Sequence, residues 1–221
     1  MDVRDAVRAR RSVRGFRDTP VDVALVERLC VEAARAPSGG NLQPWHIDIV
    51  HGEAMNRLKQ LMLARLAAGQ TEEPEYPIYP GTLDDAYAGR RREVGEAMYG
   101  HIGIAREDRV GRRGWFARNY AFFGAPVALF CTVGRGMGSP QWSDCGMFLQ
   151  TFMLLAVEEG LATCAQECWA MFPRTVTAFL GTPAERMLFC GMAVGYEDPD
   201  EPANRLRSER ADAGEWLRVV A

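Results

Sequence analysis

The sequence predicts an α+β fold in a single domain over residues 1–221, with an insertion at about residues 69–118. Three observations carry this prediction. The length matches one domain or two small ones, and no internal repeat or interdomain linker divides the chain. The composition, 48% hydrophobic and 25% charged, is that of an ordinary globular domain. Segments with helical spacing are interspersed with short apolar runs of strand length.

The N-terminal part of the chain predicts three helices and one strand. A short helix is expected over residues 2–10. Asp22 is a suitable N-cap for a second helix, which Pro37 ends. Residues 45–50 alternate in the manner of a strand, and residues 53–68 have the spacing of a third amphipathic helix.

The insertion begins with residues 69–81, whose sequence GQTEEPEYPIYPG has too many prolines and glycines for regular structure. Two charged helices are expected after it, at about residues 84–99 and 107–123. Together these elements predict a lid, and residues 69–118 are called the lid segment below.

The second half of the chain predicts the core of the sheet. The continuous apolar run at residues 127–133 is typical of a buried central strand. Residues 142–159 form the most apolar helix of the chain. A helix near residues 173–180 separates two shorter strands, near residues 163–166 and 187–194.

The C-terminal tail is polar but ends on a strand-like run at residues 216–220. An isolated strand needs a sheet edge, which is present either in its own subunit or in a partner. The helix at residues 142–159 also has a broad apolar surface, which either a subunit interface or a core within one subunit would explain.

The composition argues against several classes of function. The 26 basic and 29 acidic residues give a net charge of −3, so the chain lacks the positive field that attracts nucleic acids or anionic membranes. No run approaches the roughly 20 apolar residues of a membrane span. The six cysteines form no CxxC pair and the three histidines have no metal-ligand spacing, which disfavours a disulfide framework and a zinc site. No signal-peptide pattern is present, so a cytoplasmic location is the simplest expectation.

An arginine cluster is the first candidate binding site. Lys59 is the only lysine, so 25 of the 26 basic residues are arginine, a bias that a G+C-rich genome would explain for most positions. Alternate residues within the cluster can converge on one phosphate, for which the planar guanidinium group is suited. A solvated basic surface is the alternative. The cluster consists of Arg10, Arg11, Ser12 and Arg14. A second basic group, which could serve the same phosphate, lies near the other terminus: Arg205, Arg207 and Arg210.

A polar turn at residues 37–45, PSGGNLQPW, is the second candidate. Its two glycines let a flat ligand approach the backbone closely, and its hydroxyl and amide groups can hydrogen bond that ligand. An ordinary helix-to-strand turn is the alternative reading of this segment taken alone.

Together the two candidates resemble motifs of the FMN-dependent nitroreductase family. An RRSxRxF element stands here as RRSVRGF at residues 10–16, and PSxxNxQPW stands as PSGGNLQPW. Three further segments are similar to the corresponding parts of that family and occur in the same order: residues 122–130, 146–167 and 190–210. The lid segment is similar to a branch of the family with a longer insertion.

The resemblance implies a homodimer of α+β subunits, each with a mixed, mainly antiparallel sheet flanked by helices and a C-terminal tail that reaches the partner. Two FMN sites would lie at the subunit interface. The implied phosphate ligands are Arg10, Ser12, Arg14 and Arg210, with Arg11 in the same motif. The implied neighbours of the isoalloxazine ring, supplied by the partner subunit, are Pro37, Ser38, Gly39 and Asn41. The backbone implied beside flavin N5 is that of Ala165, Gln166 and Glu167, and Asn119 would hydrogen bond the pyrimidine edge.

The implied activity is a ping-pong oxidoreduction in which NADPH or NADH passes a hydride to flavin N5 and leaves. A small-molecule acceptor, a nitroaromatic or quinone-like compound, is then reduced. No side-chain nucleophile is needed, in agreement with the lack of a Ser-His-Asp or Cys-His constellation. Five aromatic residues either form a wall over the flavin or pack within the insertion: Tyr76, Tyr79, Tyr87, Trp115 and Phe116.

Two alternatives stay open. One is a reductive dehalogenase of the same fold, although the lid segment lacks the Glu, Tyr and Lys pattern that grips an amino-acid zwitterion. The other is a flavin-binding or flavin-degrading protein without a separate reductase substrate.

Overall fold

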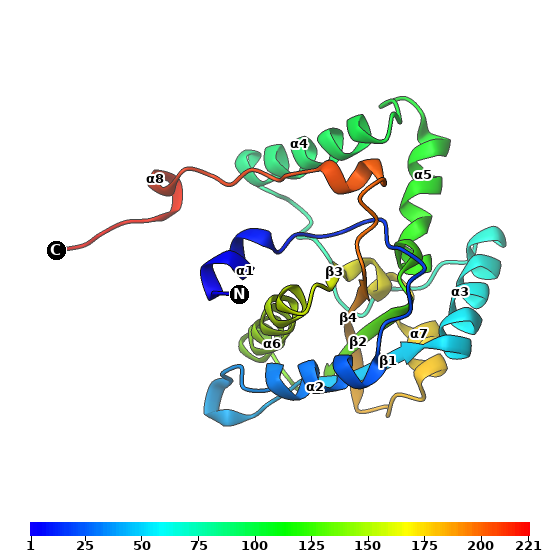
Figure 1. The fold of residues 1–221 in the computed structure, drawn as a ribbon, viewed down its shortest axis with the longest axis horizontal. Helices are drawn as coiled ribbons and strands as arrows, with labels where there is room; N and C mark the ends of the chain where they lie inside the picture. Colours follow the sequence, from blue (N-terminus) through cyan, green and yellow to red (C-terminus); the bar gives the residue numbers. More distant parts are fainter.

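The computed structural model describes residues 1–221 and contains one four-stranded sheet in which neighbouring strands are antiparallel (Figure 1). The strand order is β1-β2-β4-β3. The strands are β1 (His46–His51), β2 (Val127–Gly134), β3 (Ala162–Gln166) and β4 (Arg186–Gly195). Each begins and ends within one residue of the predicted range, because the apolar alternation or continuous apolar run that predicts it also forms the buried sheet.

Helices cover both faces of this sheet, which confirms the predicted α+β class. The α-helices are α1 (Val3–Ala9), α2 (Val23–Ala33), α3 (Gly52–Ala67), α4 (Asp85–His101), α5 (Arg109–Ala117), α6 (Ser139–Glu158), α7 (Pro173–Leu180) and α8 (Ala213–Trp216). Four short 3-10 segments join them: η1 (Gly39–Asn41), η2 (Arg118–Gly124), η3 (Glu167–Met171) and η4 (Pro202–Arg205). The predicted cap is confirmed at α2, where the Asp22 carboxylate accepts a hydrogen bond from the backbone N–H of Ala24 at 3.0 Å.

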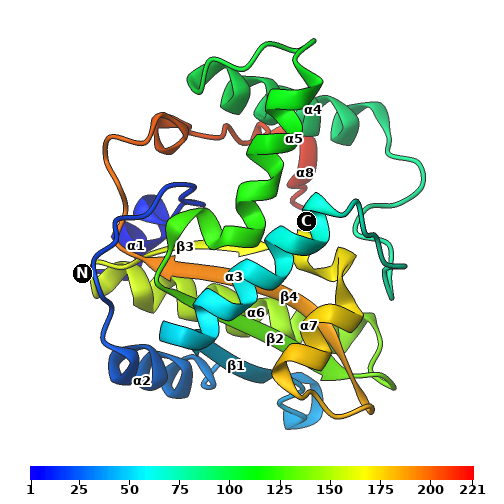
Figure 2. The ribbon, with the colours of Figure 1, turned by 90° about the vertical axis from the view of Figure 1, so that its right-hand side faces the viewer.

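The hydrophobic core lies in two layers, one on each face of the sheet. Successive residues of β2 point to opposite layers, Ala128 and Phe130 to one and Leu129 and Cys131 to the other. The first layer lies under α3, η2 and α7, and the second under α2 and α6; Figure 2 shows α3 and α6 on opposite faces. The fully buried β2 is the predicted central strand.

The helix predicted over residues 107–123 is wrong in its second half. The structure ends α5 at Ala117 and continues as η2, where Phe122 and Phe123 both have a φ of 52°. Both rings are buried, and the turn that follows leads directly into β2. Packing of these two rings into the core has overridden the helical spacing.

The tail does not add a strand to the sheet of its own subunit, which excludes the first of the two alternatives given for it. After α8 the chain is extended, and it projects away from the body of the molecule in Figure 1. Trp216 is 69% exposed and Val219 is 86% exposed. Both edge strands, β1 and β3, have their sheet neighbours on one side only.

The lid segment begins with residues 69–84, which have no helix or strand, and continues with α4 and α5. No residue of α4 is buried. The helix lies against η4, and Arg90 of α4 pairs with Glu215 of the tail at 2.5 Å. None of the helices has the length and apolar character needed to cross a membrane. All six cysteines are free thiols.

Candidate functional site

The two ends of the chain meet around a cavity of about 770 Å³. It lies between the segment that follows α1, the tail after η4, α4 and α6, and Figure 1 shows the blue N-terminal segment and the orange-red tail on the same side of the molecule. No carboxylate lines it. Its polar lining is eight arginine and serine residues and Gln150; the eight are Arg8, Arg10, Arg11, Ser12, Arg14, Arg207, Ser208 and Arg210. We call this space the arginine cavity.

A buried asparagine joins the two ends at this place. The side-chain oxygen of Asn204 accepts a hydrogen bond from the backbone N–H of Arg14 at 2.7 Å, and its amide nitrogen donates to the carbonyl oxygens of Gly15 and Asp198, both at 2.8 Å. Asn204 is 5% exposed. The only sequence signal for it was a polar residue within the segment 190–210, so its role was missed.

The arginines of the cavity differ in whether their guanidinium groups have an ion-pair or hydrogen-bond partner within the protein. The guanidinium groups of Arg8, Arg10 and Arg14 have no hydrogen-bond or ion-pair partner in the chain. Arg11 instead pairs with Glu197. The two tail arginines donate to nearby tail oxygens. The structure therefore brings together the four predicted phosphate ligands. Of the second basic group it also places Arg207 in the cavity but not Arg205, and it adds Arg8, which the sequence did not single out.

Strand β3 leads away from the cavity. Ser12 forms a parallel bridge with Thr163 at the start of β3, and Val13 donates to the Thr163 carbonyl oxygen at 3.0 Å. Three residues further along, β3 ends at Gln166, about 10 Å away at the rise of a strand. Glu167 follows it, and partial burial raises the pKa of its carboxyl group.

The side chains of Gln166 and Asn119 are used inside the protein. The Gln166 amide nitrogen donates to the Asn119 carbonyl oxygen at 2.8 Å and to its side-chain oxygen at 3.2 Å. The Asn119 amide nitrogen donates to the carbonyl oxygen of Phe116 at 2.8 Å. Gln166 is 2% exposed, so its side chain is not available to a ligand. A flavin contact of Asn119 would have to share atoms that are already hydrogen bonded.

The polar turn at residues 37–41 lies outside the arginine cavity of its own chain. Gly40 and Asn41 both have a φ of 57°, a conformation that glycine and asparagine adopt most readily. The backbone N–H of Gly39 donates to the carboxylate of Asp144 at 3.2 Å. Asp144 is 5% exposed, and sequence reasoning missed it because an acidic residue within an apolar helix has no distinctive pattern.

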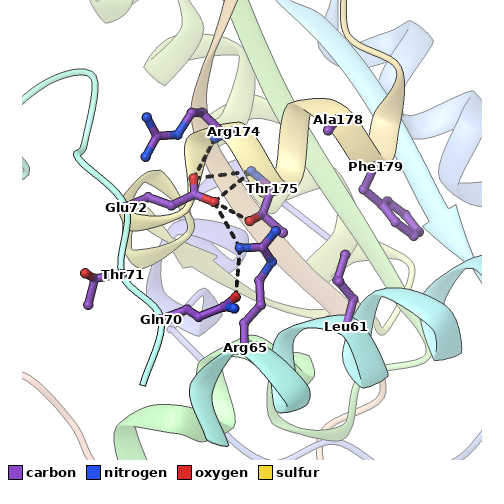
Figure 3. Close-up of a pocket in the computed structure, with 9 residues that line it drawn as sticks. All are labelled: Leu61, Arg65, Gln70, Thr71, Glu72, Arg174, Thr175, Ala178 and Phe179. Carbon is purple, nitrogen blue, oxygen red and sulfur yellow. Dashed lines mark hydrogen bonds and ion pairs between the residues drawn. The ribbon is translucent and has the colours of Figure 1, made fainter. Parts of the chain in front are cut away.

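A second cavity, of about 600 Å³, lies beneath the start of the lid segment (Figure 3). Its central group is the carboxylate of Glu72, which accepts hydrogen bonds from the backbone N–H groups of Arg174 and Thr175 at the start of α7. The Thr175 hydroxyl also donates to it, and Arg65 lies 3.6 Å away. Because these hydrogen bonds hold Glu72 to the start of α7, they anchor the beginning of the lid segment there.

The aromatic residues of the lid segment do not form one wall. Tyr76 donates a hydrogen bond to the carbonyl oxygen of Phe189 and packs edge-on against Trp142 at 4.9 Å. Trp115 is buried in the core. The other three are partly exposed: Tyr79, Tyr87 and Phe116 are 49%, 58% and 41% exposed. Packing against residues outside the insertion therefore accounts for Tyr76 and Trp115, while Tyr79 and Tyr87 contact the guanidinium groups of Arg91 and Arg90 within it.

Comparison with known proteins identifies the family. Residues 7–196 match the model of the nitroreductase family. A nitrobenzene nitroreductase of Ectopseudomonas oleovorans is 35% identical over 221 residues, which cover 98% of this chain and 96% of the relative. The crystal structure of an FMN and NADPH-dependent nitroreductase, NfnB of Sphigopyxis sp. strain HMH, has a TM-score of 0.96 and 48% identity, with full coverage of both chains.

A second solved structure is similar over the full length of both chains. It is the FMN-dependent nitroreductase NfnB of Mycobacterium smegmatis in complex with NADPH, with a TM-score of 0.93 and 29% identity. The similarity covers the arginine cavity, the sheet and the lid segment alike, since it extends over the whole chain. The chain belongs to the nitroreductase family.

Proposed function

We propose that this protein is an FMN-dependent NAD(P)H oxidoreductase that reduces nitroaromatic compounds and, as further acceptors, quinone-like compounds. The observation that carries the proposal is the arginine cavity, where several guanidinium groups lie close together without a carboxylate among them. The cavity lies next to the start of β3, the strand that ends within Ala165–Glu167. The net charge of the chain is −3, so this cluster does not belong to a positive surface that attracts anions in general. We infer that it binds one specific anion.

The donor set of the arginine cavity fits the phosphate monoester of FMN. Arginine side chains bind phosphate bidentately, and the cavity offers them with two serine hydroxyls and no competing carboxylate. The distance along β3 from Thr163, next to the arginine cavity, to Gln166 is about 10 Å. A five-carbon ribityl chain and its phosphate ester can span this distance. The phosphate would then lie in the arginine cavity, next to the start of β3, and the ring beside the end of that strand.

The chain's own residues bind and orient. Arg10, Ser12, Arg14 and Arg210 would hold the phosphate, and Arg8 and Arg207 add positive charge to the same cavity. When bound, FMN would supply the redox chemistry that links NADPH or NADH to the electron-poor acceptor. The exposed backbone at Ala165 and Glu167 would line the ring.

We also propose that the active unit is a homodimer, with the turn at residues 37–41 and the tail serving the partner subunit. The turn does not reach the arginine cavity of its own chain, and the tail has no sheet neighbour in its own subunit. Apolar side chains of α1 and α6 stand exposed on adjoining helices: Val3, Val7 and Met147 are 75%, 53% and 37% exposed. Light scattering of the purified protein tests the dimer, and a monomer would refute it.

The main reading is favoured over reductive dehalogenation, because the chain has no lysine in the lid segment. Lys59 lies on α3 and donates to the carbonyl oxygen of Ala125 at 3.0 Å. A cytoplasmic location stays a proposal, supported by six free cysteines of a kind that an oxidising compartment would disfavour.

The test is a visible spectrum followed by an anaerobic titration. Protein incubated with FMN and freed of excess should show flavin bands, which NADPH or NADH should bleach and 4-nitrobenzoate or a quinone should restore. Absence of flavin bands after addition of FMN would refute the proposal. Loss of the bands in air without an added acceptor would instead support the flavin-degrading alternative, since a reductase leaves its flavin intact.

A further inference from the structure

Two short 3-10 segments, η2 and η3, face each other through a double contact. Gln166, at the start of η3, donates both amide hydrogens to Asn119 of η2. Three residues later in each segment, the rings of Phe122 and Trp169 stack with centroids 4.6 Å apart and an interplanar angle of 23°. The Trp169 ring N–H donates to the Gln166 side-chain oxygen at 3.4 Å. We call these four residues the staple.

The staple is buried and tightly packed. Phe122 and Trp169 are 0% exposed, and Gln166 is 2% exposed. The neighbouring strand makes room for the indole ring with a glycine: a Cβ at Gly191 would lie 2.5 Å from a Trp169 ring carbon. Phe122 itself has a φ of 52°, which bulky residues rarely adopt, so the surrounding packing must hold it in place. Strain of this kind is typical of functional sites.

The staple joins two parts of the chain that the activity uses. Segment η2 continues directly from α5, the last helix of the lid segment, and η3 continues directly from the Ala165–Glu167 backbone. The amide of Gln166 has no free hydrogen-bonding group left for a ligand except the second lone pair of its oxygen. Its side chain therefore points into the staple.

We infer that the staple positions the Ala165–Glu167 backbone relative to the lid segment, and that Gln166 is a positioning residue rather than a flavin ligand. The inference rests on the proposed function, which puts this backbone beside the flavin ring. Because η2 follows α5 directly, a movement of α5 would also move Asn119 and Phe122. The contacts of these two residues with Gln166 and Trp169 would pass the movement to the end of β3. Misplacement of a reacting group by about 1 Å lowers rates up to roughly 100-fold, so a loosened staple should cost turnover.

The test compares Gln166→Leu, which keeps the bulk and removes the amide, with Gln60→Leu, the same change at an exposed position of α3. Hydrogen exchange of the protein before FMN is added gives a readout that does not depend on activity. In Gln166→Leu, exchange should rise at least about tenfold in residues 118–124 as well as in residues 165–171, because the staple couples the two segments. The control should leave both segments unchanged.

Turnover of the FMN-loaded variants gives the second readout. Gln166→Leu should bind FMN with a dissociation constant within about threefold of wild type, since the arginine cavity is intact, while kcat falls roughly 10-fold to 100-fold. Wild-type exchange in residues 118–124 or wild-type kcat would overturn the inference. Should Gln166→Leu fail to fold, Trp169→Phe takes its place, because it keeps a smaller aromatic ring in the stack and removes the indole N–H; normal exchange and normal kcat in that variant would overturn the inference equally. A wild-type protein without FMN would refute the proposed function, whereas the exchange experiment would still test the staple.

Discussion

Arg14→Ala should weaken FMN binding through the phosphate alone. The Arg14 guanidinium group lines the arginine cavity, has no partner in the protein and extends from a backbone held by Asn204. A hydrogen bond to a charged group contributes roughly 1.5–3 kcal/mol. At 1.4 kcal/mol for each factor of ten, the dissociation constant of FMN should rise about 10-fold to 150-fold. The loss should shrink at high salt because the interaction is ionic.

Quenching of flavin fluorescence by the FMN-free protein measures this effect, with riboflavin as the matched ligand that lacks the phosphate. Arg14→Ala should weaken FMN binding and leave riboflavin binding within about twofold of wild type. Arg57→Ala, an exposed change on α3 outside the cavity, is the matched control and should alter neither affinity. Equal weakening of both ligands, or full flavin occupancy in Arg14→Ala, would show that this cavity does not hold the phosphate.

Four further changes have defined outcomes. Asn204→Leu removes three buried hydrogen bonds at about 1 kcal/mol each and should lower the free energy of unfolding in urea by roughly 3 kcal/mol; a loss below 1 kcal/mol would contradict its clamping role. Asp144→Ala should cost about 1 kcal/mol in the same assay, whereas Asp144→Asn keeps an acceptor for the turn and should cost less. Gly191→Ala should lower stability by about 1–3 kcal/mol and alter tryptophan fluorescence, because its Cβ would collide with Trp169; unchanged emission would refute that contact. Burial raises the pKa of Glu167 in the folded protein above its ordinary value of 4.5. Just above pH 4.5 the folded protein therefore keeps this carboxyl group protonated while the unfolded chain loses the proton, so the free energy of unfolding falls as the pH rises through that range. Glu167→Gln should therefore match wild type well below pH 4.5 and gain melting temperature over it at neutral pH, and a constant difference across this range would refute the shift.

Local pattern was sufficient for most of the secondary structure. The apolar run of β2, the cap at Asp22 and the helix α7 all follow the predicted bounds, since strand and helix periodicity and capping depend on neighbouring residues. The same logic failed at Phe122 and Phe123. There the side chains belong to the core, and the backbone takes a left-handed conformation that no local propensity favours.

The candidate site was partly readable in the same way. Arginine and serine at residues 10–14 predicted a phosphate cradle, because alternate residues converge over a short distance. The side-chain contacts of Gln166 were not readable: the resemblance put only its backbone beside the flavin, and the structure shows that its side-chain amide is hydrogen bonded to Asn119 and Trp169. A sequence shows that a polar group is present but not which partner it has.

By itself the sequence determined the α+β class, the strand bounds and the motifs that resemble the nitroreductase family, because all of these depend on residues close together in the chain. Only the tertiary structure decided that the two termini form one cavity. Arg14 and Asn204 are 190 residues apart, and their hydrogen bond exists because the sheet between them brings both segments to the same end of β3. It also decided that η2, which follows the lid segment, is held to the end of β3 by the staple. Contacts of this range depend on how whole layers pack, which no local spacing encodes.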